Sequence, residues 1–270
     1  MTELGGIAFE LVDTHAHLQD PVLRDDLPGV LARARQAGIV QVVAIGVTAA
    51  DSCEVVELAA NHPGVFAAVG VQPNHAGEAA PGDWERVVEL VGLPKVVALG
   101  ETGLDRHWDH TPFAVQQEWF DRHLALAHEK ALPVVIHCRE CERDIVNQLS
   151  RLGRQIHGVL HSFTGTWDDA EAFLALGLSL SFAGMVTYTG KKLDPLRAVA
   201  ARVPLDRLLV ETDSPYLSPH PFRGRTNEPG RLPNTAARVA EMRGMNLGEL
   251  SQAVTANARR LFRLPSAERL

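Results

Sequence analysis

A closed (β/α)8 barrel, in which eight parallel strands alternate with helices, is the fold class that the sequence predicts. Short runs rich in Val, Ile and Leu alternate with longer amphipathic stretches, the pattern of repeated strand and helix units. The length of 270 residues fits one such barrel, which typically takes about 250 residues. No linker rich in Gly, Ser or Pro divides the chain, so we expect a single domain over residues 1–270. An open, doubly wound sheet is the alternative.

The eight expected strands are nearly continuous apolar runs, as is typical of parallel strands covered on both faces. They are residues 9–15, 39–46, 65–70, 95–100, 133–137, 157–161, 178–182 and 206–212. Helical periodicity predicts helices between them, among them 24–37, 51–61, 112–131, 140–151, 167–176 and 191–202. Residues 214–234 are rich in Pro and Gly and form a long loop after the last strand, and long loops in compact domains tend to be functional.

The composition excludes several classes of protein. Hydrophobic residues make up 46% of the chain and charged residues 22%, which rules out disordered, collagen-like and low-complexity proteins. The net charge of −7 argues against binding nucleic acid through a broad basic surface. The three cysteines cannot all pair, the N-terminus lacks a cationic start followed by an apolar run, and no stretch approaches about 18 apolar residues. We therefore expect a cytoplasmic protein with no membrane association.

Imidazole and carboxylate side chains stand at the ends of five of the eight predicted strands. Active sites of such barrels lie at the C-terminal ends of the strands, which share one rim. His15 and His17 end the first strand, and because residues two apart in an extended chain point to the same side, both rings can face one point. The other strand ends supply Glu101, His137, His161 and Asp213.

Singly, each of these residues has an ordinary structural interpretation, such as a buried histidine with a satisfied ring or a carboxylate beside a helix N-terminus. Together they are better explained by a cation, because burying several ionisable groups at one rim without one would cost several kcal/mol per charge. Imidazole and carboxylate ligands suit divalent metals, and a glutamate among them can bridge two ions about 3.5–4 Å apart. The sequence therefore predicts a divalent metal site at this rim.

Cys138 and Cys141 form a C-x-x-C motif, which is found in redox pairs and in zinc sites. The chain has no second C-x-x-C, and the pair directly follows a predicted strand end rather than opening a chain-initial strand–helix unit. We therefore do not expect a redox function for this pair.

Five segments together identify a resemblance. LVDTHAHL, ALGETGLD, PVVIHCRE, HSFTG and LLVETDSPYLSP followed by FRGRTNEP occur in the order and at the spacing typical of the TatD family of metal-dependent hydrolases. The chain resembles that family from about Val12 to Phe262. The resemblance implies an amidohydrolase-like TIM barrel and deoxyribonuclease activity, including 3′ to 5′ exonuclease action on single-stranded DNA, with DNA as the partner and no obligate protein partner.

The resemblance also implies the roles of the site residues. Two divalent cations per subunit, Zn, Mn or Mg, would form a binuclear centre that activates a water. His15 and His17 would hold one metal, and His137 and His161 the second. Glu101 would bridge the two ions, and Asp213 would lie at the first metal beside the attacking water, so that Asp213 and Glu101 are the expected catalytic residues.

The segment Gly70 to His75 departs from the family pattern, which usually reads Gly-x-His-Pro-His. Here Gln72 and Asn74 replace the two histidines, the first of which is thought to lie near the substrate phosphate. Gln72 keeps hydrogen-bonding capacity but cannot act as an acid.

Other residues are expected around the substrate. An arginine fork suits phosphate oxygens, so Arg223 and Arg139, together with Gln72, are the expected substrate-binding residues. Tyr216 and Phe222 are candidates for stacking a base, and Trp108 is expected to border the pocket.

Two other functions remain open. The same cage can attack carbonyl centres, so hydrolysis of a small ester, an amide or an aminoacyl ester is the first alternative. The second is a non-catalytic metal-bound scaffold, against which the completeness of the six-residue metal cage argues.

Overall fold

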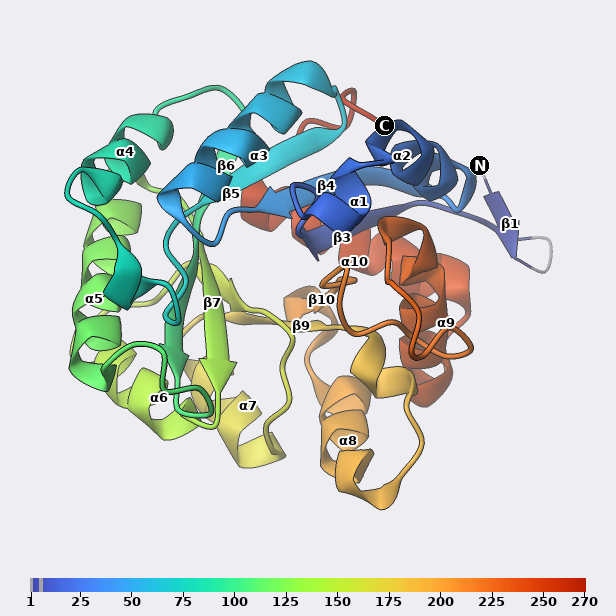
Figure 1. The fold of residues 1–270 in the computed structure, drawn as a ribbon. Helices are drawn as coiled ribbons and strands as arrows, with labels where there is room; N and C mark the ends of the chain where they lie inside the picture. The colour runs from blue at the N-terminus through green and yellow to red at the C-terminus, as the bar shows by residue number, and fades with distance from the viewer. Residues whose placement is uncertain (1, 5–6) are drawn as a thin grey trace.

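The computed structural model describes residues 2–4 and 7–270, and it contains one sheet of eight parallel strands in the order β10-β9-β8-β7-β6-β5-β4-β3 (Figure 1). Each strand therefore pairs with its neighbours in the sequence, which confirms the predicted barrel. The strands are β3 (Leu11–Ala16), β4 (Ile39–Ile45), β5 (Val65–Val69), β6 (Val96–Asp105), β7 (Val134–Arg139), β8 (Gly158–Leu160), β9 (Ser179–Phe182) and β10 (Leu208–Val210).

The first and last strands of the sheet meet and close the barrel. A parallel bridge joins Ala16 to Ser214 just past the end of β10. The backbone N–H of Asp213 donates to His15 O at 2.9 Å, and that of His17 donates to Ser214 O at 2.8 Å. These bonds exclude the open, doubly wound sheet, which would leave both edge strands unpaired.

Helices surround the strands on the outside (Figure 1). They are α1 (Pro21–Arg24), α2 (Leu27–Gln36), α3 (Ala49–Asn61), α4 (Asp83–Leu90), α5 (Phe113–Lys130), α6 (Glu142–Ser150), α7 (Trp167–Ala175), α8 (Asp194–Arg202), α9 (Leu232–Arg243) and α10 (Leu247–Phe262). Short 3-10 turns cover Ala76–Glu78, Gly184–Thr187, Lys191–Leu193, Leu205–Arg207 and Pro229–Arg231. A hairpin of β1 (Thr2–Leu4) and β2 (Ile7–Phe9) precedes the barrel. No helix among the described residues is long and apolar enough to cross a membrane.

The core has two apolar clusters, one on each side of the strands. The larger cluster fills the space between the strands and the helices around them. The smaller one joins one or two residues from each strand except β9, such as Val43, Phe66 and Val135, to Leu261 and Phe262 at the end of α10. Burial on both sides explains why the strands appear in the sequence as nearly unbroken apolar runs.

Several predicted boundaries were wrong. The predicted helix 24–37 begins only at Leu27, as α2, with Pro28 in its first turn, where a missing backbone N–H costs nothing. Arg24 instead ends the separate short helix α1, which Asp20 caps. The predicted strand 9–15 begins at Leu11, since Phe9 pairs in the hairpin instead. The predicted strand 95–100 continues to Asp105 because its last residues pair with β7. The predicted loop 214–234 is shorter than expected, because α9 begins at Leu232.

Candidate metal centre

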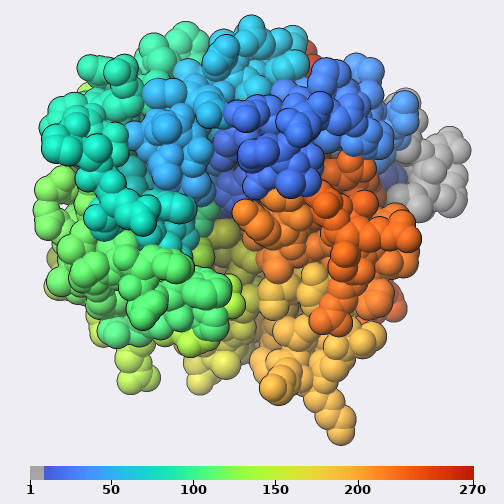
Figure 2. Space-filling view, in the orientation of Figure 1, coloured from blue at the N-terminus to red at the C-terminus, as the bar shows by residue number. Residues whose placement is uncertain are grey.

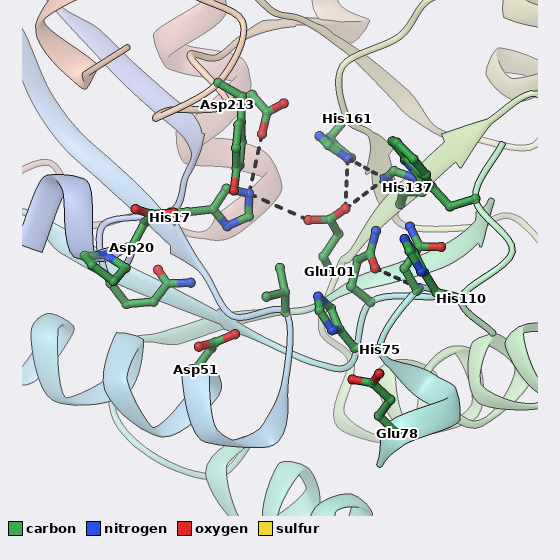
Figure 3. Close-up of a pocket in the computed structure, with 17 residues that line it drawn as sticks. His17, Asp20, Asp51, His75, Glu78, Glu101, His110, His137, His161 and Asp213 are labelled. Carbon is green, nitrogen blue, oxygen red and sulfur yellow. Dashed lines mark hydrogen bonds and ion pairs between the residues drawn. The ribbon is translucent and has the colours of Figure 1, made fainter. Parts of the chain in front are cut away.

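All six predicted metal ligands converge at the C-terminal rim of the barrel. Figure 3 shows His17, Glu101, His137, His161 and Asp213 facing one another there. The side chains come from β3, β6 and β7 and from the segments that follow β3, β8 and β10. All of them except His15 line a cavity of about 600 Å³. Figure 2 shows a hollow on this face where the N-terminal, middle and post-β10 parts of the chain meet. The residues lining the cavity are His17, Gln19, Asp20, Pro21, Val47, Asp51, Gln72, Asn74, His75, Glu78, Glu101, Trp108, His110, His137, His161, Asp213 and Tyr216.

One group of donor atoms gathers around the end of β3. His15 Nε2 and His17 Nε2 are 3.3 Å apart, and they lie 3.7 and 3.4 Å from Asp213 Oδ1. Glu101 Oε2 lies 3.5 Å from His15 Nε2 and 3.9 Å from His17 Nε2. Two nitrogens and two carboxylate oxygens thus face one small volume.

A second group uses the other oxygen of the same glutamate. Glu101 Oε1 is 2.9 Å from His137 Nδ1 and 3.2 Å from His161 Nε2. The two ring nitrogens are 3.4 Å from each other. Glu101 therefore lies between the two groups and presents one oxygen to each.

The spacing of these atoms fits a metal. Metal bonds to imidazole nitrogen and carboxylate oxygen are about 2.0–2.2 Å, so donors around a common tetrahedral ion are roughly 3.3–3.5 Å apart. Most of the observed separations lie close to this value. Two depart further from it: Glu101 Oε1 and His137 Nδ1 are at hydrogen-bond distance, 2.9 Å, and Glu101 Oε2 and His17 Nε2 are 3.9 Å apart. His15, His17 and Asp213, and also His15, Glu101 and His161, are each able to hold an ion.

Hydrogen bonds on the far side of the imidazoles fix which nitrogen faces the centre. His137 Nε2 lies 2.9 Å from Asp105 Oδ2, His161 Nδ1 lies 3.3 Å from Glu211 Oε1, and His17 Nδ1 lies 3.1 Å from the carbonyl of Ile45. Such partners orient the rings of metal-binding histidines and raise their basicity. The sequence pattern gave Asp105 and Glu211 no role, although both stand at the same strand ends as the ligands.

The protonation of the site shows a balance of opposite charges. Burial lowers the pKa of His137, but hydrogen bonds to Asp105 and Glu101 outweigh it and raise that pKa to about 9. Burial also opposes the charged form of His161, yet Glu101 holds the pKa of this ring well above its usual value. Burial raises the pKa of Glu101, but the imidazoles of His161, His137 and His15 hold it well below the usual range. Protonated imidazoles thus balance the carboxylate, and a divalent ion would replace their protons.

The backbone at Asp213 is unusual and firmly held. Asp213 has φ of 54°, in the left-handed region that non-glycine residues seldom adopt and that is found at functional sites. Its carbonyl accepts from the N–H of Tyr216 at 2.8 Å. Asn227, fully buried, donates its amide to Thr212 O at 2.9 Å and to Tyr216 O at 2.7 Å. The long loop after β10 therefore returns to brace the turn that presents Asp213, a role for Asn227 that the sequence analysis missed.

Two residues that replace the usual histidines lie beside the donor groups. Gln72 lines the cavity, and its Oε1 accepts from the N–H of Asn74 at 2.7 Å. Asn74 donates its amide to Asp105 Oδ2 at 3.0 Å, the same oxygen that lies near His137 Nε2. Asn74 therefore helps to hold the carboxylate that orients His137.

The two predicted substrate-binding arginines lie away from the donor groups. Arg139 is exposed, with its guanidinium 5.9 Å from the centre of the Trp108 ring. Arg223 is exposed too and lies 4.6 Å from the Tyr188 ring. Neither is among the described residues that line the cavity, and their contact with substrate stays a prediction. The guanidinium carbon of Arg231 lies over the Phe222 ring, 4.5 Å from the ring centre.

The two cysteines of the C-x-x-C motif are free thiols. Their sulfur atoms are 3.8 Å apart, and Cys141 donates its thiol to Leu104 O at 3.0 Å. Cys141 is buried at the N-cap of α6.

A (β/α)8 barrel whose C-terminal rim gathers imidazoles around a shared carboxylate defines a class, the metal-dependent hydrolases. The family model described as TatD related DNase matches residues 12–263. The chain therefore belongs to the TatD family.

Relatives and solved structures agree with this assignment. The chain is 38% identical over 255 residues to "Uncharacterized metal-dependent hydrolase YabD" of Bacillus subtilis, a match that covers 94% of this chain and 99% of the relative. It is 38% identical over 260 residues to "3'-5' ssDNA/RNA exonuclease TatD" of Pantoea vagans, covering 94% of this chain and all (100%) of that protein. The crystal structure of the TatD homolog YjjV from Escherichia coli aligns with a TM-score of 0.89 at 33% identity, over 96% of this chain and 100% of that one.

Proposed function

We propose that this protein is a deoxyribonuclease that uses two divalent metal ions to hydrolyse phosphodiester bonds, removing nucleotides from single-stranded DNA in the 3′ to 5′ direction. The observation that carries the proposal is the position of Glu101, with one oxygen toward His15 and His17 and the other toward His137 and His161. Enzymes that hydrolyse phosphodiester bonds commonly use two metal ions held close together. The exonuclease name of the Pantoea vagans relative supports the same reaction.

The donor groups fit two ions. His15, His17 and Asp213 would hold the first ion, His137 and His161 the second, and Glu101 would bridge them. Bound there, the ions would neutralise the phosphate and make a water acidic enough to attack phosphorus at neutral pH. Imidazole and carboxylate donors accept Zn, Mn and Mg.

In this proposal, Asp213 takes the proton from the attacking water. Its side chain is 13% exposed against 4% for Glu101, so it is the more accessible of the two carboxylates to a substrate in the cavity. Burial raises the pKa of Asp213, but the imidazoles of His17, His15 and His161 together outweigh this and lower the pKa, which keeps the carboxylate ionised and able to accept a proton. Gln72, on the cavity wall, would donate a hydrogen bond to the substrate phosphate.

Titration of the metal-free protein with Mn²⁺ or Zn²⁺ at pH 7 is expected to give about two ions per chain and to release protons. The His137 pKa of about 9 means that this ring is protonated at pH 7 without metal, and it must lose its proton to become a ligand. Calorimetry in two buffers with different ionisation enthalpies measures both quantities. A binding enthalpy that is the same in both buffers would contradict the proton release, and a stoichiometry of one would contradict the paired site.

The reaction itself is tested with single-stranded DNA labelled at its 5′ end in one sample and at its 3′ end in another. With added divalent metal, we expect the 5′-labelled strand to shorten one nucleotide at a time and the 3′ label to be released at once as a mononucleotide. The matched control is the same protein with a chelator. Release of the 5′ label as the first mononucleotide would show that the strand is degraded in the 5′ to 3′ direction instead. DNA that stays intact with every metal would refute the proposed nuclease activity.

One feature of the cavity favours a second candidate, hydrolysis of a small ester or amide that carries a positive charge. Asp20, Asp51 and Glu78 line the cavity, and no lysine or arginine is among its lining residues in the described part of the chain (Figure 3). Carboxylates at the entrance would attract an ammonium group. A panel of aminoacyl esters and amides, assayed with the DNA substrates under the same conditions, separates the two reactions.

A further inference from the structure

Two exposed aromatic rings stand on the wall of the cavity. Trp108 is 47% exposed and Tyr216 is 56% exposed, and both line the cavity that contains the donor groups. Among the described residues, the other exposed large hydrophobic side chains are the aliphatic Val22, Val88 and Leu93. Because exposed aromatic surface is costly in water, two such rings at one cavity indicate a binding surface.

The two rings border different sides of the cavity. Tyr216 packs edge-on against His17, with ring centres 6.0 Å apart. Trp108 is stacked on His110, with ring centres 5.6 Å apart and an interplanar angle of 17°. Figure 3 shows His17 and His110 on opposite sides of Glu101. A group bound over the donor atoms would therefore have an aromatic ring within reach on either side.

The backbones of both residues are tied to the two donor groups. The N–H of Trp108 donates at 3.0 Å to Asp105, the carboxylate that also lies 2.9 Å from His137. Tyr216 is bonded through its N–H to Asp213 and through its carbonyl to the buried Asn227. The rings are thus exposed while their attachment points are fixed relative to the donor atoms, the arrangement expected of a rigid binding platform.

The charges on the wall indicate what such a platform would bind. Among the lining residues that the structure describes, the imidazoles are the groups that can carry a positive charge, and no lysine or arginine lies along the wall to attract the backbone of a polyanion. A nucleobase is uncharged and flat, and any base can stack on an aromatic ring. Its exocyclic amino groups could also donate to wall carboxylates such as Asp51.

We infer that Trp108 and Tyr216 form a stacking subsite for the terminal nucleobases of the substrate strand, an inference that rests on the proposed nuclease function. Binding then depends on the base as well as on the phosphate, and only the end of the strand needs to enter the cavity. The subsite accepts any base, since stacking does not depend on the hydrogen-bonding edge.

The test compares two 5′-labelled single strands that differ only in whether the 3′-terminal nucleotide carries its base. Wild-type protein is expected to show a KM for the first cleavage about tenfold lower with the base present, the size of effect expected for one base–aromatic stack. Trp108→Ala and Tyr216→Ala are expected to raise KM for the complete strand with little change in kcat, and to reduce the difference between the strands. Trp108→Phe and Tyr216→Phe, which keep a ring, should retain part of the difference in KM between the two strands.

Leu93→Ala provides the matched control, since Leu93 is also an exposed hydrophobic residue, at 44%, and does not line the cavity. It should leave both KM values unchanged. Equal KM values for the two strands, with unchanged KM in both alanine variants, would overturn the subsite. A KM effect of Trp108→Ala confined to aromatic aminoacyl esters would also overturn it, in favour of an amino-acid side chain.

A binding measurement keeps the subsite testable if no strand is cleaved. Mixing a trinucleotide with the Asp213→Asn variant is expected to quench tryptophan fluorescence, and the quenching should disappear when Trp108→Phe is added to that variant. Quenching without cleavage by the wild type would refute the proposed nuclease but support the subsite. Cleavage by the wild type with quenching that is unaffected by Trp108→Phe would refute the subsite alone.

Discussion

Replacing Asp213 with asparagine is expected to lower kcat on single-stranded DNA by about a thousandfold, the middle of the range for loss of a general base. Asparagine has the same shape as aspartate, but its amide does not accept a proton from water at neutral pH. The substitution also removes a negative charge that lies 3.4 Å from His17 Nε2 and 3.7 Å from His15 Nε2. The measurement is kcat with saturating Mn²⁺ or Mg²⁺, together with metal content by elemental analysis.

The metal content separates the two ways in which Asp213→Asn could act. A variant that keeps its metal and loses turnover has lost the proton acceptor, whereas loss of metal as well means that Asp213 is needed as a ligand. Asp25→Asn, a change of the same kind at an exposed aspartate, is the control and should retain wild-type turnover. Wild-type turnover in Asp213→Asn would refute the proposed role of this carboxylate.

The sequence was sufficient to predict the barrel because its strands are buried on both faces. Val42 and Val43, which are adjacent and point to opposite faces of β4, are both fully buried and belong to different apolar clusters. Strand ends were harder to predict, since they depend on the partner strand. The continuation of β6 to Asp105 follows from its pairing with β7, which no local pattern in residues 101–105 encodes.

The candidate site was predictable to the extent that parallel strands share a rim. Residues at strand ends, such as Glu101 and His161, had to converge once the barrel was closed. The hydrogen-bond partners that orient the imidazoles were not predictable, because the partner of each ring comes from another strand. Asp105 reaches His137 across the pairing of β6 with β7, and Glu211 reaches His161 from beyond β10. The expectation for Arg139 rested on sequence proximity to His137, but its side chain lies outside the cavity lining, beside Trp108.

The closure of the barrel depends on another carboxylate, that of Asp13, which is fully buried. Asp13 accepts hydrogen bonds from the N–H of Thr212 at 2.9 Å, from the Thr212 hydroxyl at 2.5 Å and from the N–H of His15 at 3.3 Å. The two bonds from Thr212 join β3 to the segment after β10, one residue before Asp213. Asp13→Ala would leave the buried N–H groups of Thr212 and His15 without this acceptor, at a cost of about 1–3 kcal/mol each, whereas the Thr212 hydroxyl keeps Ser214 Oγ at 3.0 Å. We therefore expect the free energy of unfolding to fall by about 3 kcal/mol or more.

The effect of Asp13→Ala should also depend on pH, in a direction that burial determines. Burial raises the pKa of Asp13 from 3.8 to about 7, despite the hydrogen bonds from Thr212 and His15 that lower it. Between these values the folded protein binds a proton that the unfolded chain has released, so the stabilisation from this group is complete at low pH and is lost as pH rises through 7. Urea unfolding of metal-free wild type and variant should therefore show a larger difference at pH 5.5 than at pH 8. Asp13→Asn, which keeps one acceptor oxygen, should lower the free energy of unfolding less than Asp13→Ala does. Equal stability of wild type and Asp13→Ala at pH 5.5 would show that these bonds do not hold the barrel closed.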